Sequence, residues 1–349
     1  MSDILSHENL QIIWFFLWGL LWSIYFVLDG FDIGLGTLLP LVAADDDERR
    51  MVYNAAGPFW DGNEVWLITA GGVTFAAFPK AYAVMFSALY APLLILLFAL
   101  IFRAVSFEFR NKIDSRGWRK AWDTCHFFGN FLPALLLGVA FANLFKGIPI
   151  DGRGIYLGSI LSLLNLYGIA GGVFFVIVFA FHGALWLAIR AEGALHDKAR
   201  KTASMLWPAL LVMTLLFLAL TWVYTPLYNN YFKTPALLTV PFLAVTVLLA
   251  QPFCLKKGRL VSAFTASAVF IVGVTLFGVF GMFPALVPSS ISAAASITVA
   301  SAASSQVTLT IMLVVALICV PVVIAYQAWV YSLLSFKIIP EYLASEEAY

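Results

Sequence analysis

The feature that most constrains this chain is a succession of apolar stretches, each about as long as the 20-residue helix that crosses a bilayer. A charged share of 11% is also far too low to cover a soluble globule, in which about a quarter of residues are charged. The sequence therefore predicts an all-α polytopic membrane protein, with residues 1–349 forming a single transmembrane domain. Nine helices are expected, at 9–31, 52–78, 81–107, 123–145, 160–189, 204–226, 236–255, 260–287 and 308–336.

The distribution of Lys and Arg predicts the orientation of these helices. Of the 20 basic residues, only Lys80, Lys146, Arg153 and Lys233 fall in linkers on one side, and the rest follow the odd-numbered helices. Because basic residues accumulate on the cytoplasmic side, we expect a periplasmic N-terminus and a cytoplasmic C-terminus. The first apolar stretch lacks a preceding basic region, so we interpret it as a retained helix and not a signal peptide.

Carboxylates inside the expected spans are the strongest functional signal. Asp61 and Glu64 are three residues apart on one helical face, between Trp60 and Trp66, and Asp29 and Asp32 have the same spacing at the expected end of the first helix. A charged side chain at such a depth costs about 2.5 to 3.5 kcal/mol, so it usually marks a functional site. Glycines 30, 34, 36, 57 and 62 are expected to let neighbouring helices approach closely, so that Asp29 and Asp61 could face each other.

Arg103 and Glu108 follow at the same level, where the third helix leaves the membrane. Asp29, Asp61, Glu64, Glu108 and Arg103 could therefore form one polar cluster open to the cytoplasm, as proton relays do. An open alternative is that Arg103, Glu108 and Asp32 only reach the interface with long or polar side chains. No Asp or Glu occurs between Asp197 and Glu341, so we expect helices at about 9–145 to hold the proton path and those at about 204–336 to be apolar scaffold.

Cofactor ligands are weakly represented. Only His126 and His182 lie within expected spans, and we interpret His182 as a hydrogen-bonded core residue. The cysteines at 125, 254 and 319 are far apart, so no metal site is expected. The Ser- and Ala-rich stretch 288–306 contains interleaved Ile and Val and no charge, which indicates an ordered segment on the outer face.

Several long motifs resemble subunit II of the cytochrome bd-type quinol oxidases. They are DGFDIGLG (29–36), PFWDGNEVWLITAGGVTFAAFP (58–79), FRAVSFEFR (102–110), FLPALLLGVAFANLFKG (131–147), MFPALVPSSI (282–291) and SSQVTLT (304–310). They are spread from the first expected helix to the last, so the resemblance covers essentially the whole chain.

The resemblance implies a haem-free subunit of an electrogenic quinol:O2 oxidoreductase in the bacterial cytoplasmic membrane. Subunit I would hold the b-type and d-type haems and oxidise quinol, and a small single-helix subunit is sometimes present. This chain would support subunit I and line the cytoplasmic proton path, with a structural quinone in some relatives.

The resemblance also implies roles for individual residues. Asp61 matches the family's proton-path aspartate, and Asp29, Arg103 and Glu108 match polar positions near that path. Glu64 is glutamine in some members. Trp60 and Trp66 would lie near the interface with subunit I. The alternative from the residues alone is a secondary transporter with an intramembrane carboxylate site.

Overall fold

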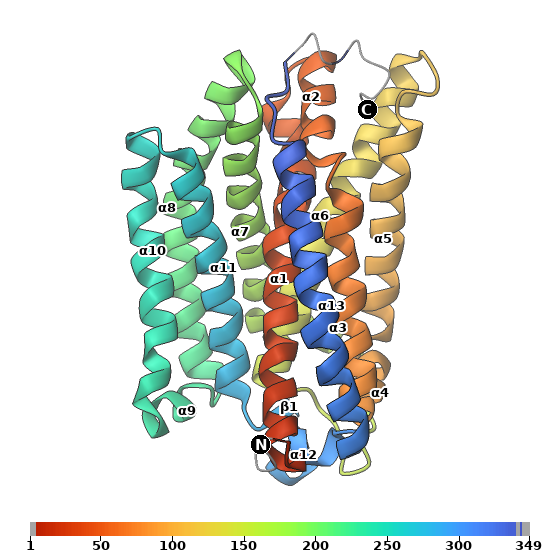
Figure 1. Cartoon of the computed structure of the whole chain (residues 1–349), viewed down its shortest axis with the longest axis vertical. Helices are drawn as coiled ribbons and strands as arrows, with labels where there is room; N and C mark the ends of the chain where they lie inside the picture. The colour runs from red at the N-terminus through yellow and green to blue at the C-terminus, as the bar shows by residue number, and fades with distance from the viewer. Residues whose placement is uncertain (1–4, 340–342, 344–349) are drawn as a thin grey trace.

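Long helices dominate the fold because backbone polar groups within a bilayer are satisfied by the hydrogen bonds of a helix. The computed structural model describes residues 5–339 and 343, and its helices run along the long axis of the molecule (Figure 1). The elements in chain order are α1 (His7–Val42), α2 (Asp46–Ala56), α3 (Trp60–Ala77), α4 (Pro79–Ala88), α5 (Tyr90–Phe109), α6 (Arg116–Lys146), η1 (Ile160–Leu163), α7 (Leu166–Arg190), α8 (Gly193–Tyr224), α9 (Tyr228–Lys233), η2 (Pro235–Leu238), α10 (Thr239–Lys256), α11 (Leu260–Met282), β1 (Ala285–Val287), η3 (Ala293–Ala295), β2 (Ile297–Thr298), α12 (Val299–Ala302) and α13 (Gln306–Leu333).

The all-α polytopic membrane fold is confirmed, with one span fewer than expected by length and apolarity. Eight helices among the described residues are long and apolar enough to cross a membrane. The expected second span, 52–78, is instead divided into α2 and α3 around Gly57, Pro58 and Phe59. Helix α3 still packs along α1 (Figure 1), but it has only 18 residues and carries Asp61 and Glu64.

Further boundaries differ from the prediction: α6, α7 and α8 begin at residues 116, 166 and 193 instead of 123, 160 and 204. Helix α1 continues to Val42 instead of ending near residue 31, because Asp29 and Asp32 are buried against protein and do not mark a helix end. The expected helix 81–107 is broken at Leu89 into α4 and α5. Pro92 explains this break, because its nitrogen cannot donate a hydrogen bond to the carbonyl of Ala88.

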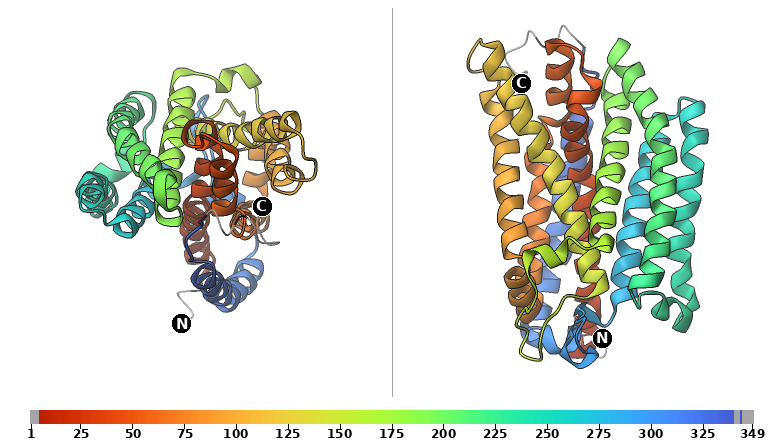
Figure 2. Two further views of the ribbon diagram at one scale, coloured as in Figure 1. Left: turned by 90° about the horizontal axis from the view of Figure 1, so that it is seen from above. Right: turned by 180° about the vertical axis from the view of Figure 1, so that it is seen from behind.

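We call one end of the bundle the basic end. It holds α2 and the turns between α5 and α6, α7 and α8, and α10 and α11, whereas α9, the two short strands and α12 lie at the opposite end (Figures 1 and 2). Segment 288–306 is ordered as expected. Its Ser304 amide donates to the Ala77 carbonyl at 2.9 Å, and Thr298 and Ser301 form a capping box on α12.

Close helix contacts depend on glycine at only some of the expected positions. A Cβ at Gly34 would lie 1.8 Å from the Phe179 carbonyl oxygen of α7, and one at Gly36 would lie 2.0 Å from Asn130. A Cβ at Gly129 of α6 would be 2.7 Å from the Arg103 nitrogen. Gly62 has nothing within 4 Å of such an atom, so its predicted packing role is wrong in this chain.

Candidate functional site

Arg103 is the centre of the candidate site. It lies in α5, is 0% exposed, and holds carboxylates from two other helices. Its Nη1 donates to Asp29 Oδ1 of α1 and its Nη2 to Glu64 Oε2 of α3, each at 2.8 Å. We call these three residues the Arg103 cluster. Side chains in a helix tilt toward its N-terminus, so the guanidinium of Arg103 points away from the basic end.

The charges of the Arg103 cluster do not balance. Asp29 is completely buried and the Glu64 side chain is 23% exposed. Two carboxylates share one guanidinium, so one negative charge is uncompensated when both are ionised. A proton on either carboxyl group would remove that charge. The cluster is therefore suited to accept and release a proton, and the interpretation of Arg103 as an interfacial residue is wrong.

A second set of hydrogen bonds extends the site from α1 to α13. Asn63 donates to Asp32 Oδ2 at 2.7 Å and accepts from the Tyr331 hydroxyl at 2.8 Å. Trp66 Nε1 donates to Gln327 Oε1 at 3.0 Å. Asp32 is only 2% exposed, so it is not an interfacial group either. Helix α13 therefore supplies polar groups to a site that the sequence assigned to the first helices alone.

Asp61 and Glu108 lie apart from this cluster. Both side chains are exposed, and neither makes a hydrogen bond or ion pair with any residue that the structure describes. The expected meeting of Asp29 and Asp61 is therefore wrong within this chain, because Asp29 meets Arg103. Trp60 stacks on Phe107 with ring centroids 5.4 Å apart, and Trp66 is buried.

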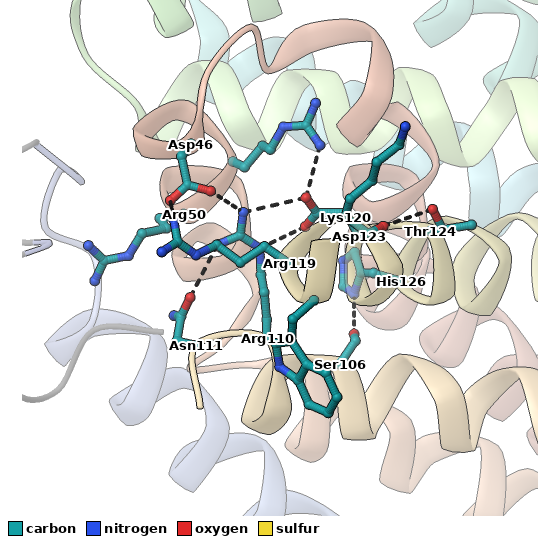
Figure 3. A network of polar contacts seen from close by, with 12 residues as sticks. Asp46, Arg50, Ser106, Arg110, Asn111, Arg119, Lys120, Asp123, Thr124 and His126 are labelled. Carbon is teal, nitrogen blue, oxygen red and sulfur yellow. Dashed lines mark hydrogen bonds and ion pairs between the residues drawn. The ribbon is translucent and has the colours of Figure 1, made fainter. Parts of the chain in front are cut away.

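An ion network at the basic end fastens α2 to α5 and α6 (Figure 3). Arg110 Nε donates to Asp123 Oδ1 at 2.7 Å, and its Nη2 donates to Asp46 Oδ1 at 2.6 Å. Arg49 adds a bond to Asp123 at 2.9 Å, and Arg119 one to Asp46 at 3.3 Å. Partial burial would raise the pKa of Asp46, but the hydrogen bond and charge of Arg110 outweigh it and lower that pKa.

Sequence reasoning missed this network. It placed Asp46 in a linker and Asp123 at a helix boundary, and gave neither a partner. The available signal was that acidic and basic residues occur together in the segments 45–50 and 110–123. Their pairing depends on α2 folding back beside α6, which no local pattern specifies.

The two membrane histidines belong to separate packed clusters. His182 Nδ1 bonds the Ser267 hydroxyl at 3.0 Å, its Nε2 bonds the Val27 carbonyl at 3.1 Å, and its ring stacks on Phe264. This confirms that His182 is a hydrogen-bonded core residue. His126 lies 4.3 Å from the ring of Tyr53 and bonds Ser106. Because both rings are packed against aromatic side chains, these residues do not fit a haem held between them.

No group of three or more His, Cys, Asp or Glu residues that could hold a metal ion occurs in residues 5–339 or at 343. The acidic residues of the Arg103 cluster are held by a guanidinium instead. The groups around these acids and Asp32 supply hydrogen bonds from Arg103 and Asn63.

Comparisons with known proteins agree with this picture of a membrane subunit. The family model for cytochrome bd terminal oxidase subunit II matches residues 10–334. Cytochrome bd-I ubiquinol oxidase subunit 2 of Escherichia coli K12 is 37% identical over 360 residues, covering 94% of each chain. Cytochrome bd ubiquinol oxidase subunit 2 of Bacillus subtilis strain 168 is 37% identical over 325 residues, covering 93% of this chain and 95% of its own.

The fold has a solved counterpart as well. A chain from the structure of bd oxidase from Geobacillus thermodenitrificans aligns with a TM-score of 0.73 and 16% identity, over 93% of this chain and 98% of that one. At that identity the match shows the fold, while the family model and the two relatives carry the assignment. With its motifs, its buried acid–arginine cluster and these matches in agreement, the chain belongs to the cytochrome bd terminal oxidase subunit II family.

Proposed function

We propose that this chain is the haem-free subunit of a quinol:O2 oxidoreductase and that its Arg103 cluster passes protons from the basic end toward a haem-bearing partner. The observation that carries the proposal is the pair of carboxylates, Asp29 and Glu64, that share one buried guanidinium. The relatives are ubiquinol oxidase subunits by name, which supports quinol as the electron donor and a respiratory role in a bacterial cytoplasmic membrane.

The position of Asp61 indicates that a protein partner covers the outward face of α3. It is level with Asp32, since the adjacent Asn63 bonds that residue, and Asp32 is ten residues before the end of α1, or about 15 Å along a helix. At that depth Asp61 is exposed beside apolar Val65 and Ile68, which are 49% and 71% exposed. An exposed carboxylate would be costly against lipid, so we assign this face to subunit I.

The same face gives the protons a direction. Glu64 is one helical turn from Asp61 in α3, so a proton from the Arg103 cluster reaches the partner's face by one short step. With the basic end in the cytoplasm, as the positive-inside rule favours, the protons come from the cytoplasm. Each proton drawn from the cytoplasm moves one positive charge into the membrane potential. Moving one elementary charge through 100 mV corresponds to about 2.3 kcal/mol.

The haems belong to subunit I in this proposal, since the histidines of this chain are packed against aromatic rings. Those haems supply electron transfer and oxygen reduction in the complex, and this chain's residues bind and move the protons. A groove of about 490 Å³ between α1, α11 and α13 could hold a structural quinone. Its walls are apolar except near Gln327 and Tyr331, which suits an isoprenoid chain with a polar head.

Asparagine at position 29 and glutamine at 64 test the proposal in the assembled oxidase. Each variant keeps a hydrogen-bonding group for Arg103 but cannot take up a proton. We expect Asp29→Asn and Glu64→Gln to lower oxygen consumption by about tenfold or more, as loss of proton-transfer groups usually does, with the haem spectrum unchanged. Asp61→Asn should do the same.

Asp151→Asn is the matched control, because Asp151 is an acid of a loop at the opposite end that pairs with Arg153. It should retain normal turnover. Unchanged turnover in the three site variants, or loss of the haems together with activity, would overturn the proposal in favour of a purely structural subunit.

A further inference from the structure

A buried polar line joins the basic-end network to the Arg103 cluster. Asp123 and His126 are three residues apart in α6 and lie on one face of it. His126 is 1% exposed, and its Nδ1 lies 2.8 Å from the Ser106 hydroxyl. That hydroxyl also lies 2.6 Å from the Arg103 carbonyl. Figure 3 shows His126 pointing to Ser106, below Asp123.

The order of these residues along the bundle follows from helix packing. Gly129, one turn beyond His126, touches the backbone of Arg103. The guanidinium of Arg103 lies further still from the basic end, beside Asp29. Passing inward from the basic end, the line therefore runs through Asp123, His126, Ser106 and the Arg103 cluster.

Several polar atoms beside this line have no protein partner. Tyr53 Oη, Asn130 Oδ1, Arg103 Nε and Asp29 Oδ2 are all buried without a hydrogen bond to the described residues. Tyr53 and Asn130 both contact His126, through its ring and its carbonyl. Because a buried polar atom left unpaired costs about 1 to 3 kcal/mol, such atoms normally bind internal water.

The His126 ring itself has one open nitrogen. Only its Nδ1 hydrogen-bonds to the part of the chain that the structure describes, whereas both nitrogens of His182 are bonded to protein. The charged groups on either side of His126 are Arg110 and Asp123 toward the basic end, which pair with each other, and Arg103 on the inner side, which pairs with Asp29 and Glu64. With both arginines paired, the open nitrogen of His126 can accept a proton without an unpaired cation beside it.

We propose that His126 is a proton-relay residue between the basic-end network and the Arg103 cluster. A proton arriving through water binds Nε2, and the proton on Nδ1 moves to Ser106. The Ser106 hydroxyl proton then leaves through water to the carboxylate of Asp29 or Glu64. One proton enters at Nε2 and one leaves from Nδ1, so the ring returns to its starting charge with its remaining proton on Nε2. The inference rests on the proposed function and adds the entry route to it.

Two substitutions at His126 and one at His182 test the relay in the assembled oxidase. His126→Phe keeps a ring against Tyr53, and His126→Asn keeps a hydrogen bond to Ser106, but neither side chain can relay a proton. His182→Phe is the matched control, since His182 is an equally buried histidine with a serine partner that lies off the line. The readouts are oxygen consumption in H2O and D2O, proton uptake by a pH indicator, and the haem spectrum.

We expect both His126 variants to slow proton uptake by about tenfold and to raise the solvent isotope effect, with normal haem content, while His182→Phe stays near the parent. The relay is refuted if His126→Asn, which preserves the local hydrogen bond, takes up protons at the parent rate. If Asp29→Asn is slow while His126→Asn is normal, the proposed function stands and only this route fails. If neither variant is slow, the proposed function fails as well.

Discussion

At the scale of single residues, the site depends on one arginine that holds two acids. Arg103 is fully buried and reaches α1 and α3 from α5. Desolvating three ionic groups is costly, and the arrangement depends on the guanidinium bonding both carboxylates at once. Removing the central cation therefore affects stability more than removing either acid.

Arg103→Gln should destabilise the protein by about 3 to 5 kcal/mol, since it leaves the buried Asp29 and the partly buried Glu64 without a cation. Thermal unfolding of the assembled complex in detergent would show this as a lower transition temperature and a lower yield. The triple variant that adds Asp29→Asn and Glu64→Gln carries no unpaired charge and should recover most of the loss. If the triple variant is as unstable as the single one, charge imbalance is not the cause.

At the scale of elements, α13 is held at its ends more than along its length. Only 6% of its most apolar window is buried. Near one end the Leu309 carbonyl accepts from Trp14 at 3.0 Å, and near the other Tyr331 and Gln327 bond to α3. The groove described above lies beside this second end of the helix, at Ile324, Gln327, Ala328 and Tyr331.

Gln327→Leu should lower the free energy of local opening at the α13 end near Asn63 by about 1 kcal/mol. This is the usual contribution of one hydrogen bond of this kind. Faster hydrogen exchange at residues 324–333 would report it, with exchange in α7 unchanged. Ile318→Leu changes the exposed face of the same helix. It should leave hydrogen exchange unchanged both at residues 324–333 and in α7. Equal effects of the two substitutions would mean that the polar contacts do not fasten α13.

The attachment of α2 should depend on acid pH. Arg110 lowers the pKa of Asp46 from its ordinary 3.8, so the folded state favours the ionised carboxylate. The resulting stabilisation is present above pH 3.8 and is lost as the pH falls through the lower, folded value. Because the Asp46 side chain is 43% exposed, the contribution should be about 1 kcal/mol or less.

Hydrogen exchange in α2 measured from pH 6 down to pH 3 would show this loosening, after correction for the intrinsic effect of pH on exchange. Asp46→Asn has no carboxylate to titrate, so its α2 should be looser at pH 6 and should change less on acidification. An identical acid response in parent and variant would exclude Asp46 as the responsible group.

At the scale of the whole molecule, the apolar outer surface must divide between lipid and protein. Figure 2 shows α8, α10 and α11 grouped on one side of the bundle and α5 and α6 on the other. Exposed apolar residues occur on both sides, but within residues 5–339 only the α3 face combines them with an exposed carboxylate away from the ends of the bundle. We therefore expect the partner on the α3 face and lipid around α8.

Ile68→Trp and Val212→Trp compare these two surfaces. The two side chains are 71% and 64% exposed and lie on α3 and α8. A tryptophan at position 68 should block close packing and reduce co-purification of the haem-bearing subunit severalfold, since overpacked contacts cost about 1 to 3 kcal/mol. At position 212 it should be tolerated by lipid. Normal assembly of the Ile68→Trp variant would place the partner elsewhere.

The sequence by itself determined the membrane fold, most of the spans and the residue types of the site, because hydropathy and depth-dependent charge cost act locally along the chain. It also placed Asp29, Glu64 and Arg103 at one level. It did not determine which acid meets the arginine: Asp61 and Glu64 lie only about 60° apart around α3 at 100° per residue, so both fall on one face and only packing sets which of them meets Arg103.

Only the tertiary structure decided the remaining features. The turn after α1 brings Asp46 to Arg110, and α13 brings Tyr331 to Asn63, contacts between residues 64 and 268 positions apart. The continuation of α1 past Asp29 and Asp32 has the same origin. In the sequence, Asp29 and Asp32 predicted a helix end, because isolated charges favour water. In the structure, partners from α3 and α5 bond them inside the bundle. Pairing of this kind depends on three-dimensional proximity, which no local pattern records.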